Sequence, residues 1–391
     1  MRVAVLGGTS RRGRRVIRDL LERPEVSGVV LVGPPEHEHE LSRLVAVLDP
    51  RRAMGAAVPF TVEGIAQAFG GLDLALACLE RNERGGASEE GVEQELTAFE
   101  AAVANGIPYV SSTEDPPTIE AMLAQHPGLG DVTGVAVPGM SWTPGLSNLL
   151  VRAASEQLDT IGSIRIAWTI SRRDEGADLA RLLTTWSGDA EVIEEGQRRR
   201  RRAGSRSHRR FFPQPVGWQR VGLARGAEIL TLPQIVGDVE FFHIEAGMDG
   251  ISAPSLARAA ARLSRAGGTA KAAPPSLGAL TRSVAVALHP SATRPSGWSA
   301  LRVDVEGTYA GSARTETYGI VDHLVNLETA PLVVAGLLAA RGEVQARGVA
   351  PPESAFDPAR FLAVLAERGV RAARLERDDL SAERATLRLQ R

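Results

Sequence analysis

Cysteine and lysine are almost absent from this sequence, which contains one of each, Cys78 and Lys271. A single cysteine cannot form an intramolecular disulfide or a cysteine-rich metal site, so folds that depend on either are excluded. This composition fits a reducing cytosol, and we expect a cytoplasmic protein. Because arginine carries nearly all of the basic charge, the scarcity of lysine indicates genome composition rather than a function.

Long apolar runs and an excess of charge are also missing. The longest apolar helical run, Ala330–Ala340, is about half of the ~20 residues that cross a bilayer, so we expect no membrane span. The first residues lack the pattern of a secretory signal, and we expect none. The net charge of −2 argues against nucleic-acid binding by the whole surface.

Two kinds of catalytic motif are absent as well. No histidine and glutamate have the helical spacing of a zinc site, and no serine lies in a nucleophile elbow, so we expect no metal.

The 391 residues, with 43% hydrophobic and 24% charged side chains, have the composition of an ordinary globular protein. Their number allows two domains.

The first 150 residues alternate short apolar runs with helical segments. The spacing of Val16, Ile17 and Leu20 predicts an amphipathic helix over 14–24, between the first two apolar runs. Such a repeated strand–helix–strand pattern is typical of a parallel sheet with right-handed crossovers. We therefore predict an α/β, Rossmann-like domain over 1–150, with strands at 2–7, 28–33, 72–79, 107–112 and 134–139.

Two further regions follow this domain. Alternating polar and apolar residues at 163–171 and 300–311 predict antiparallel strands with one solvated face, hence a second, α+β domain over 151–325. Residues 326–391 return to a helical pattern. There we predict a helix capped by Thr329 that ends at Gly342, and another helix over 358–369.

The opening segment VAVLGGTSRRGRRV contains the first turn from strand to helix. A glycine-rich turn there directs backbone N–H groups and the positive end of the helix dipole at one point, where an anion binds. The spacing Gly7, Ser10, Gly13 places a serine where a central glycine is usual, and its hydroxyl is a candidate phosphate ligand. We predict that a dinucleotide pyrophosphate binds this loop, which comprises Gly7, Gly8, Thr9, Ser10, Arg11, Arg12 and Gly13. The alternative is a glycine-rich turn that only reverses the chain.

The form of the nicotinamide cofactor depends on the end of the second strand. An acidic residue that would bind the ribose hydroxyls of NAD is missing or displaced there. The guanidinium groups of Arg11 and Arg12 suit the 2′-phosphate of NADP. NADP is therefore preferred over NAD, although a solvated helix start explains the two arginines equally well.

Several segments resemble the saccharopine dehydrogenase-like oxidoreductases. They are GVAVPGMSWTPGLSNLLV at 134–151, AAVANGIPYVSST at 101–113, EILTLPQI at 228–235 and the stretch 329–370. The resemblance assigns 228–235 to a central strand and 329–370 to closing helices that return to a Rossmann domain interrupted by the second domain. It implies an NAD(P)-dependent enzyme that oxidises an amine or reduces an imine of an amino acid or polyamine. It also implies an active site between the domains and a homodimer formed through the second domain.

Candidate cofactor and substrate residues lie where the parallel strands end. We expect Cys78 and Leu79 after one strand, and Ser111, Ser112 and Thr113 after another, to contact the nicotinamide ribose. The turn PGMSWTPG supplies substrate candidates: Gly139, Ser141, Trp142, Pro144 and Gly145. We expect Trp142 at the crest of this turn, as a pocket wall or as packing between domains. The backbone N–H groups of Leu146 and Ser147 are expected to face a substrate carboxylate or the cofactor.

Candidates for proton transfer lie in the second domain. His243 and Glu245 share one face of a predicted strand, which is either a catalytic wall or a solvated sheet face, and His323 is a weaker candidate. The arginine-rich run Arg198–Arg210 is expected to be a solvated loop, or alternatively an anion-docking element. The leading hypothesis is an NAD(P)-dependent oxidoreductase that acts on a small molecule. The alternative is a non-catalytic dinucleotide-binding scaffold or sensor.

Overall fold

The computed structural model describes residues 1–79, 89–125, 134–174, 185–186, 188–249 and 297–375. The chain divides into two compact units. The first comprises 1–82, 86–149 and 325–369, and the second comprises 83–85, 150–324 and 370–391. The largest segment of the second unit, 150–324, thus interrupts the first unit along the chain, and the two units are described separately below.

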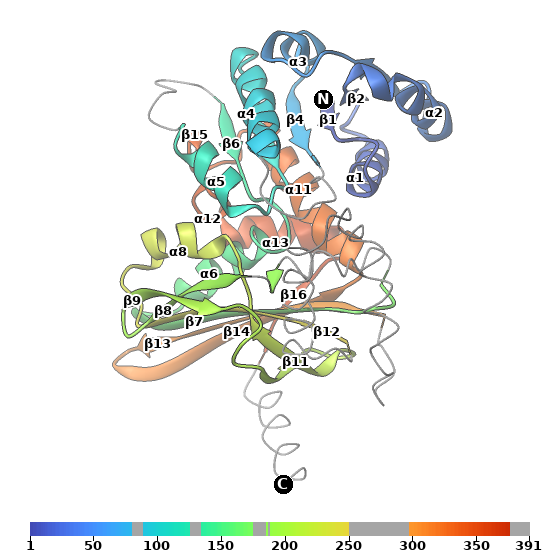
Figure 1. Ribbon diagram of the computed structural model, residues 1–391. Helices are drawn as coiled ribbons and strands as arrows, with labels where there is room; N and C mark the ends of the chain where they lie inside the picture. Colours follow the sequence, from blue (N-terminus) through green and yellow to red (C-terminus); the bar gives the residue numbers. More distant parts are fainter. Residues whose placement is uncertain (80–88, 126–133, 175–184, 187, 250–296, 376–391) are drawn as a thin grey trace, which may run out of the picture. The chain divides into compact units, whose positions relative to one another are not determined.

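The first unit contains a seven-stranded parallel sheet (Figure 1), whose strand order is β3-β2-β1-β4-β5-β6-β15. The strands are β1 (Arg2–Leu6), β2 (Gly28–Gly33), β3 (Ala53–Ala57), β4 (Leu74–Ala77), β5 (Tyr109–Ser111), β6 (Val135–Val137) and β15 (Gly348–Val349). Strand order reverses between β1 and β4, the position at which dinucleotides bind in doubly wound sheets. The predicted Rossmann-like domain is confirmed.

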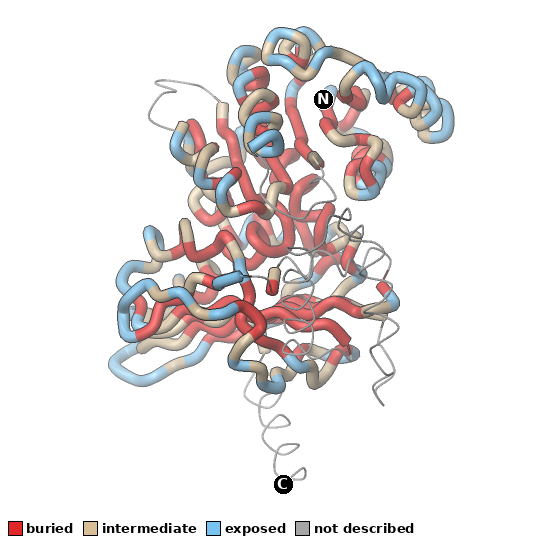
Figure 2. Tube along the Cα trace, viewed as in Figure 1, coloured by how far each residue is buried: buried red, intermediate tan, exposed pale blue. Residues whose placement is uncertain are grey.

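Helices cover both faces of this sheet. Helices α3 (Val62–Phe69), α4 (Glu89–Ala104) and α5 (Pro116–Leu123) pack on the face that contains Ala4 and Leu6. Helix α1 (Arg11–Leu21) places Ile17 against Leu31 on the other face. Gly336 of α11 (Leu324–Ala340) lies directly on Leu74 and Leu76. Figure 2 shows the strands buried between these layers.

The remaining helical segments of the first unit are shorter or more peripheral. They are the 3₁₀ turn η1 (Pro35–His37), α2 (Glu38–Leu48), α12 (Pro352–Ala355), α13 (Pro358–Glu367) and the start of α6 (Leu146–Ser155). The predicted helix at 358–369 is confirmed as α13, and Gly369 follows it with φ +87°. None of the described helices is both long and apolar enough to cross a membrane.

The second unit contains a nine-stranded, mostly antiparallel sheet. Its main order is β10-β11-β12-β7-β13-β14-β16, and β8 pairs with β12 and β9. The strands are β7 (Thr160–Ile170), β8 (Asp189–Glu194), β9 (Gln197–Arg202), β10 (His208–Phe212), β11 (Gly217–Leu223), β12 (Phe241–Met248), β13 (Ser299–Tyr309), β14 (Ser312–Asp322) and β16 (Ala372–Arg374). Strands β7 and β12 are parallel, and the other pairs are antiparallel. The predicted antiparallel strands at 163–171 and 300–311 are confirmed as β7 and β13.

The two faces of the second sheet differ in chemistry. Register places Ile166 beside Ile244 and Val303 on one face, and all three side chains are buried. On the opposite face Arg165 lies beside His243 and Asp304. The alternation read in the sequence therefore separates an apolar face from a charged one. The charged face is largely buried, because His243 and Asp304 are only 3% and 4% exposed.

Three predictions of local structure are wrong. Residues 228–235 form helix α8 (Glu228–Val236) rather than a central strand. Helix α11 begins at Leu324, so Thr329 lies inside it, where its Oγ1 donates to the carbonyl of Val325 at 2.6 Å instead of capping the helix. The arginine-rich run forms strands β9 and β10 rather than a solvated loop.

Candidate functional site

The glycine-rich loop after β1 is tightly folded around two glycines. Gly7 has φ +68°, and a Cβ atom there would lie 2.3 Å from the carbonyl oxygen of Cys78. A Cβ at Gly13 would lie 2.2 Å from the carbonyl oxygen of Gly7. Only glycine fits these two positions, so α1 approaches the end of β1 closely, as a pyrophosphate-binding turn requires. The cradle therefore fits a dinucleotide.

Ser10 is the N-cap of α1. Its Oγ accepts a hydrogen bond from the Gly13 amide at 2.9 Å and lies 3.4 Å from the carbonyl oxygen of Cys78, to which it donates. The hydroxyl that we predicted as a phosphate ligand is thus engaged within the loop. The positive end of the α1 dipole lies at this loop, so the attraction for an anion comes from the backbone.

Arg12 does not extend into solvent as a free 2′-phosphate ligand would. Its Nη2 lies 3.1 Å from Oε1 of Glu328 in α11 and 3.3 Å from Oε1 of Glu114, which follows β5. Burial lowers the pKa of Arg12, but the two carboxylates outweigh it and raise the pKa above its ordinary value. Glu114 also accepts a hydrogen bond from Ser141 Oγ at 2.8 Å. This network ties the first turn of α1 to the segments after β5 and β6.

A second arginine, which sequence reasoning missed, lies beside the loop on the side of α2. Arg14 Nε donates to the carbonyl of Thr9 at 2.9 Å, and its Nη2 lies 2.8 Å from Glu40 in α2. Arg14 thus connects the glycine-rich loop to the segment after β2, while Arg11 is exposed. The signal was the i, i+3 spacing of Arg11 and Arg14, which places both on one side of the helix.

The predicted residues at the ends of β4 and β5 are brought to the same edge of the sheet, beside β1. Cys78 is buried, and its amide donates to the Leu6 carbonyl at 3.0 Å. Ser112 Oγ donates to the Ala77 carbonyl at 3.0 Å, and Ser111 Oγ accepts from the Thr113 amide at 3.1 Å. The two serine hydroxyls thus fasten β5 to its surroundings, whereas Leu79 and Thr113 are partly exposed at this edge.

The turn at 138–145 is an interior feature. Gly139 and Gly145 have φ of +76° and +113°, and a Cβ at Gly145 would lie 2.5 Å from the Ser141 carbonyl oxygen. Ser141, Trp142 and Pro144 are buried, so Trp142 does not lie at an exposed crest.

The prediction of available amides after this turn is wrong. The Leu146 amide donates to the Ser141 carbonyl at 2.9 Å, and the Ser147 amide donates to the Trp142 carbonyl at 3.0 Å. The tight turn folds its own carbonyl oxygens back onto the start of α6, so these amides are already satisfied.

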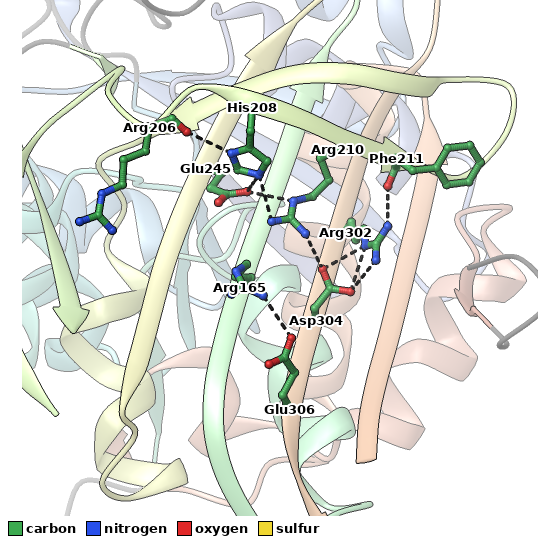
Figure 3. A network of polar contacts seen from close by, with 9 residues as sticks. All are labelled: Arg165, Arg206, His208, Arg210, Phe211, Glu245, Arg302, Asp304 and Glu306. Carbon is green, nitrogen blue, oxygen red and sulfur yellow. Dashed lines mark hydrogen bonds and ion pairs between the residues drawn. The ribbon is translucent and has the colours of Figure 1, made fainter. Parts of the chain in front are cut away.

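In the second unit, His243 and Glu245 lie on one face of β12, as predicted, but each has its own partner. His243 Nε2 lies 3.1 Å from Oε1 of Glu194, and burial lowers the pKa of His243 to about 4. Glu245 Oε2 accepts from Arg210 Nε at 3.0 Å (Figure 3). A buried, neutral histidine held by Glu194 is a poor proton shuttle near neutral pH.

Glu245 belongs to a larger charged network on this sheet face (Figure 3). Arg210 also contacts Asp304 at 3.3 Å, and Arg302 binds Asp304 through its Nε and Nη2 and donates to the Phe211 carbonyl at 2.7 Å. Nearby, Arg165 pairs with Glu306 at 3.1 Å. The network joins β10, β12 and β13 and gives Glu245 a structural role, while its predicted catalytic role stays a prediction.

Most of the arginine-rich run is paired within the second unit. Arg201 and Arg206 each lie 2.6 Å from Glu194, and Arg198 Nη2 donates to the Ile229 carbonyl at 3.0 Å. Arg199 pairs with Glu195. Among the residues that the structure describes, no group of three or more His, Cys, Asp or Glu side chains is arranged to hold a metal ion.

No protein-family model matches this sequence, and no curated protein matches it significantly. Among solved structures the chain is similar to apo saccharopine dehydrogenase (L-Glu forming) from Saccharomyces cerevisiae, with a TM-score of 0.69 and 12% identity over 96% of this chain and 100% of the yeast chain. An engineered D-amino acid dehydrogenase has a TM-score of 0.45 at 14% identity, over 93% of this chain and 96% of its own. C. glutamicum DAP dehydrogenase in complex with DAP has a TM-score of 0.43 at 13% identity, over 98% of each chain.

The likeness to the yeast protein covers both units and confirms the fold class predicted from the sequence. At this level of identity the likeness shows the fold alone, and the chemistry has to be inferred from the residues of this chain. The chain has a saccharopine dehydrogenase-like fold, in which a Rossmann-like parallel sheet unit is interrupted by a second unit with a mostly antiparallel sheet.

Proposed function

We propose that the protein is an NAD(P)-dependent oxidoreductase. One observation carries this proposal: the turn between β1 and α1 has glycines at the two positions, Gly7 and Gly13, where a Cβ atom would collide with backbone. Such a turn brings a pyrophosphate against the N-terminus of the helix at the switch point of the sheet. Residues 7–13 would hold the pyrophosphate, and the ends of β4 and β5 would face the nicotinamide ribose.

NADP is our preferred cofactor. Strand β2 ends at Gly33, and Pro34 and Pro35 follow it, so no carboxylate stands directly at the strand end to bind ribose hydroxyls or repel a 2′-phosphate. Arg11 is exposed, and Arg14 is fixed beside the loop by Thr9 and Glu40. Guanidinium groups in this place favour a phosphate through charge-assisted hydrogen bonds.

We propose a C–N bond of an amino acid or polyamine-like small molecule as the site of reaction. The resemblance of the segments 101–113, 134–151 and 329–370 to saccharopine dehydrogenase-like enzymes supports this substrate class, and the fold shared with the yeast saccharopine dehydrogenase agrees with it. A bound nicotinamide would accept or supply the hydride. This chain must orient the substrate carbon and move one proton. A substrate site between the domains and the substrate roles of 139–145 stay predictions.

Fluorescence titration with NADPH and NADH tests the proposed cofactor. We expect NADPH to bind more tightly than NADH, and Arg14→Gln to raise the Kd for NADPH about tenfold while changing that for NADH little, because a 2′-phosphate contact is lost. Arg51→Gln, at another exposed arginine of the same unit, is the matched control. If the wild-type protein binds neither dinucleotide at millimolar concentration, the oxidoreductase proposal fails.

A panel of amines, imines and carbonyl compounds then tests the reaction. Turnover of an amine or imine with NADP(H) is the expected result. Dinucleotide binding without turnover across the whole panel would instead favour the non-catalytic scaffold or sensor.

We also propose a homodimer, on the basis of the family resemblance. Light scattering coupled to size exclusion should then give about twice the chain mass of 41.5 kDa, and a monomer at micromolar concentration would contradict the dimer.

A further inference from the structure

An exposed histidine at the end of β14 is paired with a buried carboxylate. His323 Nδ1 lies 3.6 Å from Asp174 Oδ1; the His323 side chain is 51% exposed, and that of Asp174 is 1% exposed. A histidine that faces solvent and is backed by a buried aspartate has the arrangement of a general acid–base group. The carboxylate lies on the Nδ1 side of the ring, and this leaves Nε2, on the other side, to exchange a proton.

The carboxylate of Asp174 is itself fixed. Its Oδ2 accepts hydrogen bonds from Ser299 Oγ at 2.9 Å and from the Leu324 amide at 2.6 Å. Ser299 is fully buried in β13, and Leu324 is the first residue of α11. These bonds hold Asp174 to β13 and to the first residue of α11, so its orientation toward His323 is defined by the fold rather than by a surface loop.

The imidazole ring is held from a second direction. Trp298 stacks on it with a centroid distance of 4.5 Å and an interplanar angle of 21°. The His323 backbone amide donates to Asp322 Oδ1 at 2.6 Å. Ordering an exposed side chain costs conformational entropy, so a ring restrained by both an aspartate and an indole is preorganised.

His323 also differs from the other histidine singled out by the sequence. His243 is 3% exposed, whereas His323 presents half of its side chain to solvent. Along the chain, His323 directly precedes α11, and Glu328 of that helix binds Arg12 beside the glycine-rich loop. Along the chain, His323 is thus five residues from Glu328, a side chain that contacts the predicted cofactor cradle.

We propose that His323, oriented by Asp174 and Trp298, is the general acid–base residue of this oxidoreductase. The inference rests on the proposed function. In amine oxidation, hydrogen would leave the carbon of the C–N bond with the C–H electron pair, as a hydride that a bound nicotinamide would accept, while the nitrogen loses a proton to the Nε2 lone pair of His323. The C=N bond forms as the C–H and N–H bonds break. In imine reduction the same proton returns from the imidazolium to nitrogen as the hydride adds to carbon.

Three variants of the full-length protein test this role, assayed on an amine or imine of the panel. His323→Ala should lower kcat by about 100-fold or more, the contribution expected of a general acid–base group. His323→Phe keeps a ring for stacking on Trp298 and should be equally impaired. Asp174→Asn should lower kcat less. NADPH affinity, measured by fluorescence, should stay within about twofold of wild type in all three.

Added imidazole distinguishes proton transfer by His323 from a structural role of its ring. It should restore part of the kcat of His323→Ala but none of that of His323→Phe, whose ring fills the space. His39→Ala, at an exposed histidine of α2, is the control and should retain wild-type turnover. Wild-type kcat in His323→Ala, or loss without any rescue by imidazole, would overturn the role of His323. Both results leave dinucleotide binding intact, whereas failure of the proposed function appears as absence of that binding in the wild-type protein.

Discussion

Glu95 is a titratable residue inside the core of the first unit. It lies on the buried side of α4, 3% exposed, and Tyr109 Oη donates to its Oε1 at 2.6 Å. Burial raises the pKa of Glu95 despite hydrogen bonds from Ser111 and Tyr109, and burial also raises the pKa of Tyr109. A protonated glutamic acid can both accept from Tyr109 and donate to Ser111, which a carboxylate cannot.

This environment predicts a pH dependence of stability. The folded protein keeps the proton of Glu95 above pH 4.5, where the unfolded chain releases it, so the stabilisation is complete below about pH 4.5 and is lost as pH rises through the folded pKa. Glu95→Gln should therefore lose less stability than wild type between pH 5 and pH 8, measured by urea unfolding.

A matched substitution checks that the effect comes from burial. Glu100→Gln changes an exposed glutamate of the same helix and should leave the wild-type dependence between pH 5 and pH 8 in place. Parallel pH profiles for wild type and Glu95→Gln would contradict the buried-acid account.

His243 predicts a pH dependence of the opposite sign. Its pKa of about 4 lies below the ordinary 6.5 because of burial, so its contribution is complete above about pH 6.5 and is lost as pH falls toward 4. The loss amounts to about 3 kcal/mol at most. His243→Asn can still donate to Glu194 but has no imidazole to protonate. Its free energy of unfolding should therefore decrease less than that of wild type as pH falls from 6.5 to 4. Urea midpoints at pH 7 and pH 4.5 measure this, and an unchanged difference between them would refute it.

At the scale of elements, Gly13 fixes the distance between α1 and β1. Gly13→Ala would place a Cβ 2.2 Å from the Gly7 carbonyl oxygen, which is backbone and cannot rotate away. The helix would have to move outward, and we expect a loss of about 1–3 kcal/mol of stability, typical of overpacking. NADPH binding should weaken at least tenfold, because the amides of the first turn move with the helix. Urea unfolding and fluorescence titration measure the two effects.

Gly8→Ala is the control within the same loop. Its new Cβ would first meet the Cδ1 atom of Ile17 at 3.1 Å, the end of a flexible side chain. Both stability and NADPH affinity should therefore stay closer to wild type than in Gly13→Ala. Equal effects of the two substitutions would show that the backbone contact of Gly13 does not set the geometry of the loop.

Elements buried on both faces were the predictable ones. Strands β1, β2 and β4 are continuous apolar runs, so their positions and the Rossmann-like order follow from the sequence. Strand β3 was missed because it is a sheet edge of sequence AMGAA with exposed Met54 and Gly55. Strand β9 was missed because its five arginines obey no apolar alternation, and the partners of Arg198 and Arg201 lie on other elements of the folded chain.

The candidate site was predictable only in part, for a related reason. Glycine at positions 7 and 13 indicates a tight turn in the sequence itself, so the cradle could be predicted. Arg12 was assigned to a cofactor phosphate because its partners, Glu114 and Glu328, are more than 100 and 300 residues away along the chain. His323 and Asp174 are likewise far apart along the chain, and only the folded second unit brings them together. No local spacing in the sequence could therefore predict their contact.

At the scale of the whole molecule, charge is balanced both in number and in place. The chain has 45 basic and 47 acidic residues, and its most basic segment faces carboxylates across β8 and β9, where Glu191 lies opposite Arg200 and Glu194 follows at the strand end. A basic cluster neutralised in this way projects little field into solvent. We therefore expect the run to contribute to the second sheet rather than to the recognition of polyanions.

Replacing Arg198–Arg202 by serine tests this assignment against anion docking. We expect the wild-type protein to bind neither duplex DNA nor vesicles of anionic lipid at 150 mM salt, and we expect the variant to lose up to about 3 kcal/mol of stability from several partly exposed ion pairs. Co-sedimentation and urea unfolding measure the two quantities. Salt-sensitive binding by the wild type that disappears in the variant would identify the run as an anion-docking element, because release of counterions is the mark of such contacts. If the wild type binds neither polyanion and the variant is less stable, these arginines stabilise the fold, as their pairing with Glu194 and Glu195 indicates.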